Sequence, residues 1–436
     1  MNWGKVVVKL NVKSKDIDYA HPLNIYGSDS YTGTGFFISN DTILTCYHVV
    51  ENAINIEIIF NQTINIQGKI KHIFPDDDLA IIQLEYPLDN DSITILELKN
   101  IIKTNDEQVM VVGFPLDSTN VKITKGIISG YQESLIQTDA SLNSGNSGGP
   151  MVVEEDGNYK IIGVNVSKIT GDVDRVGYVV PIYRFMILQK KLLTKEIVIK
   201  KPLLFLDYQY LVQQELRKCL FKHCEYNLIN KNIGVRFTLI NENYYLNKYF
   251  KIDEILIAIN STFVDNLGNI KFDFYPEKIS INDIGLWFVE DDELDFLIYN
   301  PIYRKFRNVK IKLEIIKNNL TDYFNFDTYP KSIINNNGLI LSIVTKEHIN
   351  NIKYLNMTTS QAVKILSRYL QQQDQFTIYL ADLDLERVKN KFIKYPLGEI
   401  IIEINGKKFN NLEEFMKINE NPIKIIKTFD NEIYLI

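Results

Sequence analysis

The chain has 436 residues, more than one hydrophobic core usually holds, and this length predicts two to four domains. Hydrophobic residues make up 45% of the sequence and charged residues 23%, the proportions of a folded globular protein, so general disorder is excluded. The 54 acidic and 48 basic residues are interspersed and give a net charge of −6. Because no long basic block could follow a phosphate backbone, we expect no nucleic-acid partner.

Cysteine content and apolar runs indicate the compartment. The three cysteines, Cys46, Cys219 and Cys224, cannot all pair, and their spacing matches no metal-ligand pattern. We therefore expect a reducing compartment, no metal and no cofactor. The first residues have the pattern of a strand and not of a secretory signal, and no apolar run reaches the roughly 18 residues of a membrane helix. The sequence thus predicts a soluble protein of the cytoplasm or another intracellular reducing compartment, with no membrane partner.

From Val6 to about Val180 the sequence consists of short β-branched and aromatic runs separated by Gly, Asn and Asp. Many short strands punctuated by turns favour an all-β barrel or sandwich. A first helix is predicted at about 182–193, where three apolar side chains share one face: Phe185, Leu188 and Leu192. The lysine-rich stretch 190–201, closed by Pro202, indicates a domain boundary.

The second half of the chain carries the same local pattern twice. Residues 252–263 and 397–409 each contain an acidic turn, an apolar strand and a tight Asn turn, 145 residues apart (397 minus 252). The repeat suggests duplicated modules, because its period is too long for a solenoid. Between the copies, 359–373 predicts a helix capped by Thr358 or Thr359. Its apolar face would comprise Ala362, Ile365, Leu366, Tyr369 and Leu370.

One serine lies in a turn suited to covalent catalysis. A serine hydroxyl becomes a nucleophile near neutral pH when an imidazole takes its proton, a carboxylate orients that imidazole and backbone N–H groups receive the oxyanion. The string GNSGGP at 145–150 places Ser147 between glycines that allow a strained turn with two N–H groups pointing inward. Taken alone, the string also fits an ordinary turn.

His48 and Asp78 are the candidate partners of Ser147. His48 follows an apolar strand, and Asp78 directly precedes another, so we expect its carboxylate to be shielded and held against an imidazole. Asp76 and Asp77 are interpreted as residues of a solvated turn. A lone histidine or aspartate is more often structural, but His, Asp and Ser occur here in that order within one predicted β domain, 30 (78 minus 48) and 69 (147 minus 78) residues apart. The remaining histidines are interpreted as surface or packing residues: His21, His72, His223 and His348.

Longer strings extend this pattern to a known family. The chain resembles the HtrA/Deg proteases over essentially all of the first 185 residues, in the strings TGFFI (34–38), LTCYHVV (44–50), DLA (78–80), VGFP (112–115), GIISG (126–130), QTDASLNSGNSGGP (137–150) and GYVVPI (177–182). The resemblance implies a chymotrypsin-like fold of two six-stranded β-barrels with the site between them. It makes Ser147 the nucleophile, His48 the general base and then acid, and Asp78 the orienting carboxylate, while N–H groups of Gly145 and Ser147 form the oxyanion hole.

The departures from the family pattern touch no catalytic atom. Ser144 stands where the family usually has proline, and Cys46 with Tyr47 replaces the usual small or amide pair before the histidine. Two further residues bear on specificity and control. Ser141, six positions before Ser147, is uncharged, which predicts cleavage after small or medium apolar residues. Asn146 cannot pair with a buried ammonium, so activation by N-terminal cleavage is not expected.

By the same resemblance, the two repeated strands look like α+β PDZ modules. The first copy has Ile252 where the motif prefers glycine, whereas Gly398 keeps that glycine in the second. The second module looks like the divergent module of plant-type Deg proteases, from about Tyr329 onward, and its role would be assembly.

A peptide-binding loop is also implied in the first module. The loop made of Ile233, Gly234 and Val235 resembles one whose N–H groups hold the terminal carboxylate of a peptide that adds a strand to the sheet edge. The alternative is that Gly234 only opens a strand.

These patterns predict a protease domain at 1–195, a PDZ-like domain at 203–322 and a divergent PDZ-like domain at 323–436. The predicted function is an ATP-independent serine endopeptidase that cleaves unfolded or specific proteins in quality control or processing. Family behaviour implies a homo-oligomer built on trimers. Two alternatives stay open: a binding or chaperone protein with an idle protease, and a dedicated processing enzyme of viral type.

Overall fold

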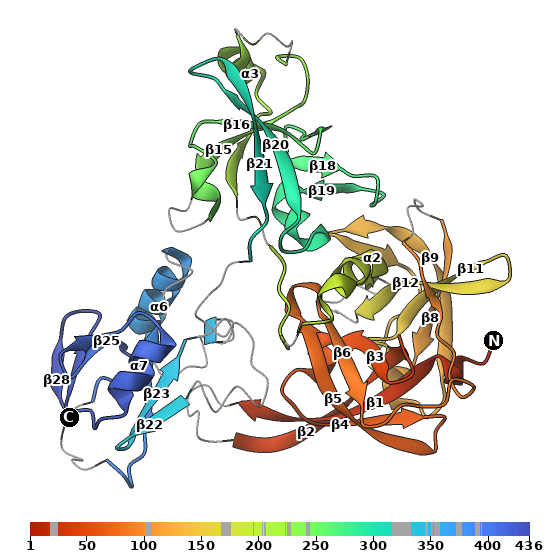
Figure 1. Cartoon of the computed structure of the whole chain (residues 1–436), viewed down its shortest axis with the longest axis horizontal. Coiled ribbons are helices and arrows are strands. Elements are labelled where there is room, and N and C mark those ends of the chain that lie inside the picture. The colour runs from red at the N-terminus through yellow and green to blue at the C-terminus, as the bar shows by residue number, and fades with distance from the viewer. Residues whose placement is uncertain are drawn as a thin grey trace. The chain divides into compact units, whose positions relative to one another are not determined.

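Figure 1 shows the computed structural model of the whole chain. The chain divides into two compact units. The first contains Met1–Val12, Tyr31–Val50 and Ile56–Ile316, and the second Lys13–Ser30, Glu51–Asn55 and Lys317–Ile436. The residues that the structure describes are 1–17, 25–100, 106–166, 176–194, 196–202, 204, 206–222, 224, 228–240, 245–315, 333–344, 348–349, 352, 358–371, 377–388, 393 and 395–436. His21, His223 and the start of the second module at Tyr329 lie outside them. No helix in these described ranges is long and apolar enough to cross a membrane.

The N-terminal strands close into a barrel. Their order around it is β1 (Val7–Ile17), β2 (Ile25–Phe37), β3 (Thr42–Cys46), β6 (Leu79–Leu84), β5 (Ile64–Phe74) and β4 (Ala53–Phe60). Strands β3 and β6 are apolar along almost their whole length and are buried accordingly. Short helices accompany this barrel and the next: η1 (Trp3–Lys5), α1 (Tyr47–Val50), η2 (Pro75–Asp77) and η3 (Pro115–Asp117).

A second barrel follows along the chain. Its strands are β8 (Gln108–Gly113), β9 (Lys122–Gln132), β10 (Leu135–Thr138), β13 (Gly177–Pro181), β12 (Asn158–Val166) and β11 (Pro150–Glu155), and β7 (Glu97–Leu98) adds to β12. Because β11 pairs with both β8 and β12, the six strands form a closed ring. Small and β-branched side chains such as Val111, Val153 and Val179 fill it. The predicted double β-barrel is therefore confirmed.

The helix predicted at 182–193 is shorter and less regular than expected. An α-helix, α2 (Ile182–Met186), passes directly into a 3-10 helix, η4 (Ile187–Lys191). Phe185 and Leu188 are buried as the apolar face predicts.

The next sheet belongs to the first repeated module. Its order is β14 (Asp207–Tyr210), β15 (Val235–Leu239), β16 (Ile255–Ile259), β20 (Glu293–Asn300) and β21 (Lys305–Lys312), with β17 (Thr262–Phe263) paired to β16. The module also contains the hairpin β18 (Asn269–Lys271) and β19 (Lys278–Ser280), and the helices α3 (Gln214–Phe221), η5 (Tyr245–Lys248) and η6 (Ile281–Trp287). Two separate apolar clusters pack on this sheet, and the larger contains Phe237, Phe250 and Trp287.

The second repeated module has a similar composition of elements. Its sheet runs β22 (Ile333–Asn336), β23 (Leu339–Ile343), β24 (Ile378–Leu383), β25 (Ile400–Ile404), β27 (Ile425–Thr428) and β28 (Ile433–Leu435), with β26 (Lys407–Lys408) on β25. Two helices accompany the sheet, α6 (Thr359–Gln371) and α7 (Leu412–Asn419). The predicted cap of α6 is confirmed, because Thr358 Oγ1 accepts the Gln361 amide at 3.3 Å.

The duplicated Asn turns have the same backbone conformation and make similar side-chain hydrogen bonds in both modules. Asn260 (φ 49°) and Asn405 (φ 51°) both end an apolar strand in left-handed backbone conformation. Asn260 Oδ1 accepts the amide of Asp295, and Asn405 Oδ1 accepts the amide of Lys424, so each side chain ties its turn to a neighbouring segment. The acidic turn needs one correction. Gly398 has a φ of 76° in the second copy. The residue with the corresponding conformation in the first copy is Asp253, with a φ of 73°, and not Ile252.

Candidate active site

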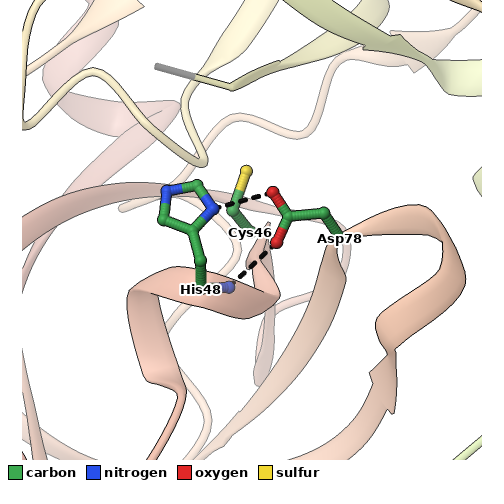
Figure 2. Close-up of side chains that lie close together, drawn as sticks. All are labelled: Cys46, His48 and Asp78. Atoms are coloured by element: carbon green, nitrogen blue, oxygen red, sulfur yellow. Dashed lines mark hydrogen bonds and ion pairs between the residues drawn. The ribbon is translucent and has the colours of Figure 1, made fainter. Parts of the chain in front are cut away.

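The His48 and Asp78 side chains lie together on one face of the first barrel (Figure 2). Helix α1 starts directly after β3, and its first turn presents His48 to Asp78. The His48 amide donates to Asp78 Oδ1 at 2.9 Å, and His48 Nδ1 lies 2.7 Å from Asp78 Oδ2. The imidazole is 40% exposed and the carboxylate 31%. The pair is thus fixed at two points and still accessible to a substrate.

The backbone around Asp78 is unusual and well supported. The 3-10 helix η2 (Pro75–Asp77) ends at Asp78, which has left-handed dihedrals (φ 52°, ψ 41°). The Asp78 amide donates to Pro75 O at 3.2 Å, and the Tyr47 amide donates to Asp78 O at 3.0 Å. A non-glycine residue in this conformation needs such support from its surroundings.

The expectation that Asp76 and Asp77 form a solvated turn is wrong. Asp77 is 2% exposed, and its Oδ1 accepts a hydrogen bond of 2.6 Å from Arg184 Nε. Lys201 Nζ lies 3.5 Å from Asp77 Oδ2, and the Lys201 amide donates to Asp76 Oδ2 at 2.9 Å. The physical reason is that buried cations from distant parts of the chain compensate these carboxylates, which a local acidic run does not reveal.

Ser147 lies in the loop between β10 and β11, against the first barrel. Ser147 is 6% exposed, and its carbonyl accepts the Thr34 amide at 2.9 Å. The next residue, Gly148 (φ 81°), has no room for a side chain, because a Cβ would lie 2.1 Å from Thr45 Oγ1 and 2.9 Å from the Cys46 amide. The serine loop therefore packs against β3, the strand that leads into His48.

Gly145 has the backbone freedom that the serine turn was predicted to need. Its φ is 94°, and a Cβ there would lie 2.3 Å from Phe114 O. The following residue, Asn146, is 2% exposed, and its amide donates to Asn143 O at 3.0 Å. Only glycine satisfies both the dihedral and the space at position 145.

Thr34 is a residue of the site whose role was not predicted from the sequence, although it begins the TGFFI string. It is fully buried, and its hydroxyl donates to Gly145 O at 2.6 Å and accepts from the Phe114 amide at 3.0 Å. Thr34 also donates its amide to Ser147 O. One residue of the first barrel thus holds both ends of the turn that carries the serine.

Cys46 lies behind the His48 and Asp78 pair. Its sulfur and one ligand-type atom of each of the other two residues lie within 4.8 Å of one another (Figure 2). The thiol donates to Asn165 O at 3.2 Å, and burial raises the pKa of Cys46 well above its usual value. A neutral thiol bonded to a carbonyl is a packing group and a poor metal ligand, since metals bind the thiolate.

Comparison with known proteins agrees with this geometry. Residues 33–164 match the family model described as a trypsin-like peptidase domain. A putative mitochondrial protease Do-like 3 of Arabidopsis thaliana is 28% identical over 61% of this chain, and a probable periplasmic DegP-like serine endoprotease of Rickettsia conorii is 25% identical over 90% of it. The chain is thus similar to serine proteases of the HtrA/Deg type, and the matched part is the trypsin-like peptidase domain. The chain spans 47% of the length of the Arabidopsis protein and 72% of the Rickettsia protein.

A solved structure of the HtrA-type protease AlgW with a tripeptide shares the fold of this chain. The TM-score is 0.51 at 18% identity, over 71% of this chain and 93% of that one. At this identity the likeness shows a common fold.

The predicted carboxylate-binding loop does not open onto a free sheet edge. Gly234 has φ 91°, and its amide donates to Val264 O at 2.8 Å; the Ile233 amide donates to Lys231 O. Val235 begins β15, which pairs with β14 on one side and β16 on the other. Both sides of β15 at Val235 are thus paired within the chain, and peptide binding at this loop stays a prediction.

Proposed function

We propose that this chain is a serine endopeptidase in which Ser147, His48 and Asp78 act as a catalytic triad. The observation that carries the proposal is the double contact of His48 with Asp78, beside a glycine-flanked serine that is fastened to the strand before His48. Similarity to the HtrA/Deg proteases and the match to a trypsin-like peptidase domain support the same chemistry.

The proposed reaction uses each group in one role. Ser147 Oγ attacks the carbonyl carbon of the scissile peptide while His48 Nε2 takes its proton, and Asp78 stabilises the imidazolium through Nδ1–H. The N–H groups of Gly145 and Ser147 receive the negative charge of the tetrahedral intermediate. His48 then gives its proton to the leaving amine as the C–N bond breaks, and water hydrolyses the acyl-enzyme by the same steps.

We further propose substrates, modules and assembly from the family. Unfolded or specific proteins are the substrates, in quality control or processing, and the active form is a homo-oligomer built on trimers. Residues 1–195 form the protease domain, and 203–322 and 323–436 form PDZ-like domains. Cys46, Cys219 and Cys224 form no disulfide, which suits a reducing compartment.

The test is the cleavage of unfolded casein by the full-length chain. Ser147→Ala removes the nucleophile and little volume, so activity should fall by roughly 10⁴- to 10⁶-fold while the circular dichroism spectrum stays unchanged. His48→Ala should lose activity similarly. Ser360→Ala, which changes an exposed serine of α6, serves as the matched control. Equal turnover of wild type and Ser147→Ala would contradict the mechanism, and inactivity of both would favour the idle-protease alternative.

A further inference from the structure

The segment that follows the second barrel, residues 196–201, returns to the strand and turn that lead into Asp78. His72 Nδ1–H donates to Glu196 O at 2.8 Å. The Ile73 amide donates to Ile197 O at 2.7 Å, and the Ile199 amide donates to Ile73 O at 2.9 Å. The segment thus runs parallel to the end of β5 as an added strand, with Ile73 opposite Val198.

The segment ends in a buried ionic cluster directly before Asp78. Lys201, Asp77 and Arg184 are 3%, 2% and 3% exposed. Lys201 contributes its amide to Asp76 Oδ2 at 2.9 Å and its ammonium to Asp77 at 3.5 Å. Arg184 binds the same two residues, through Nε to Asp77 Oδ1 at 2.6 Å and through Nη2 to Asp76 O at 2.9 Å. The whole turn before Asp78 is therefore fixed by cations from two later parts of the chain.

This anchoring matters because Asp78 has a strained backbone. Its left-handed conformation persists only where neighbours over-determine it. On one side, Tyr47 and His48 hold Asp78 through its carbonyl and carboxylate. On the other side, Asp76 and Asp77 are held by Arg184 and Lys201. The position of the Asp78 carboxylate relative to the imidazole depends on both sets of contacts.

We propose that residues 196–201 are a positioning element for the Asp78 carboxylate, and that Lys201 is the residue through which this element acts. The inference rests on the proposed protease function. Lys201 contacts neither His48 nor Asp78 in any hydrogen bond or ion pair described for it, so its role is to hold the turn. The chain continues from Lys201 to Leu204 and Leu206, which are buried in the core of the first repeated module. The same segment therefore ties that module to the turn of Asp78.

The charges around Lys201 show that the arrangement costs stability. The groups facing the ammonium are Asp77 and Asp76, which favour its charge, and Arg184, which opposes it; burial outweighs them and lowers the pKa of Lys201 to about 8. A buried ion pair of this kind is often no more stable than apolar packing. Its presence beside a catalytic turn is explained by placement of that turn.

The experiment compares Lys201→Met, which keeps an unbranched side chain one atom shorter and removes the ammonium, with Lys190→Met at an exposed lysine of η4, in the full-length chain. Because a displacement of about 1 Å in a catalytic group can cost roughly 10²-fold, we expect kcat of Lys201→Met to fall by roughly 10- to 100-fold with KM nearly unchanged. Wild-type kcat should also decline as pH rises through about 8, where Lys201 loses its proton, and the variant should lack this decline. Lys190→Met should match wild type.

A second measurement reads the geometry without any activity. In a Ser147→Ala background, the His48 Nδ1–H proton bonded to Asp78 should give a far-downfield ¹H NMR signal that Lys201→Met shifts or removes and Lys190→Met leaves in place. If Lys201→Met does not fold, Asp76→Ala, which removes the acceptor of the Lys201 amide, should give the same two results. A folded Lys201→Met with wild-type kcat and an unchanged downfield proton would overturn the proposal. Absence of Ser147-dependent activity in wild type would instead contradict the proposed protease function. The NMR comparison alone would then decide whether residues 196–201 position Asp78.

Discussion

Thr34 shows how one buried hydroxyl can organise a site made by two barrels. It satisfies the Gly145 carbonyl and the Phe114 amide at once, and its own carbonyl accepts Thr45 Oγ1 at 2.7 Å. A buried donor or acceptor that loses its partner costs roughly 1–3 kcal/mol. Removing the hydroxyl would therefore release the turn that carries Ser147.

We expect Thr34→Val, which keeps the side-chain shape, to lower kcat by roughly 10- to 100-fold, because the serine loop loses its fixed position. Thr34→Ser keeps the hydroxyl and should retain most of the activity. Initial rates on a fluorogenic peptide, with Thr63→Val at an exposed turn as the control, would measure this. Equal losses in the Val and Ser variants would show that the methyl group and not the hydroxyl matters.

The depressed pKa of Lys201 predicts a pH dependence of stability. The folded-state pKa of about 8 lies below the ordinary 10.5, so between these values the unfolded chain binds a proton that the folded chain has released. The free energy of unfolding contributed by Lys201 therefore rises with pH across this window, and the full penalty of the buried charge is present below pH 8. Stability and kcat should thus move in opposite directions as Lys201 deprotonates.

Urea unfolding of wild type and Lys201→Met at pH 7.5 and pH 9.5 measures this effect. The urea midpoint of wild type, relative to that of Lys201→Met at the same pH, should be higher at pH 9.5 than at pH 7.5. A difference that stays constant would mean that Lys201 has the same pKa in the folded and unfolded chains.

Local patterns indicate the candidate site residues but not the contacts that hold them in place. The sequence settings of His48, Asp78 and Ser147 are recognisable within a few positions of each residue. Asp77, in contrast, is paired with Arg184, 107 positions later, and no short string indicates such a partner. Its burial could be inferred only from the folded chain.

At the scale of elements, local sequence patterns predicted helices and turns but did not predict which strands pair with each other. The period of the apolar residues gave α6 at Thr359–Gln371, close to the expected 359–373, and the Asn turns recur as expected. Whether a strand is central or at an edge depends on segments elsewhere in the chain. Strand β15 looked like an edge because β14, a polar segment of four residues, carries little strand signal.

The serine loop combines both kinds of information. Its glycines indicate a turn that needs positive φ, and Gly145 and Gly148 have positive φ in the structure. Their crowding against Phe114 O and Thr45 Oγ1 belongs to the folded barrels. The conformation of the loop is therefore determined by its own glycines, and its position is determined by contacts with residues distant in the sequence.

At the scale of the first unit, an aromatic cluster joins the second barrel to the first repeated module. We use the name aromatic cluster for Tyr131, Tyr183, Phe274, Tyr275 and Trp287. Trp287 is 1% exposed, its ring centroid lies 4.4 Å from that of Tyr275, and its Nε1–H donates to Ser134 Oγ at 3.4 Å. Tyr183 of α2 stacks on Phe274 at 5.2 Å. Module and barrel therefore share buried aromatic surface and should resist local opening together.

Trp287→Ala tests this shared stability. Truncating a buried tryptophan costs about 3–5 kcal/mol, and here the loss falls on contacts that belong to both parts. Hydrogen exchange followed by mass spectrometry should speed up in η6 and also in the β9–β10 turn of the barrel. The chain offers one other tryptophan as the control, Trp3, which packs on Tyr159 of β12 at 5.0 Å. Trp3→Ala should leave exchange in η6 unchanged. Faster exchange confined to the module in Trp287→Ala would show that barrel and module open independently.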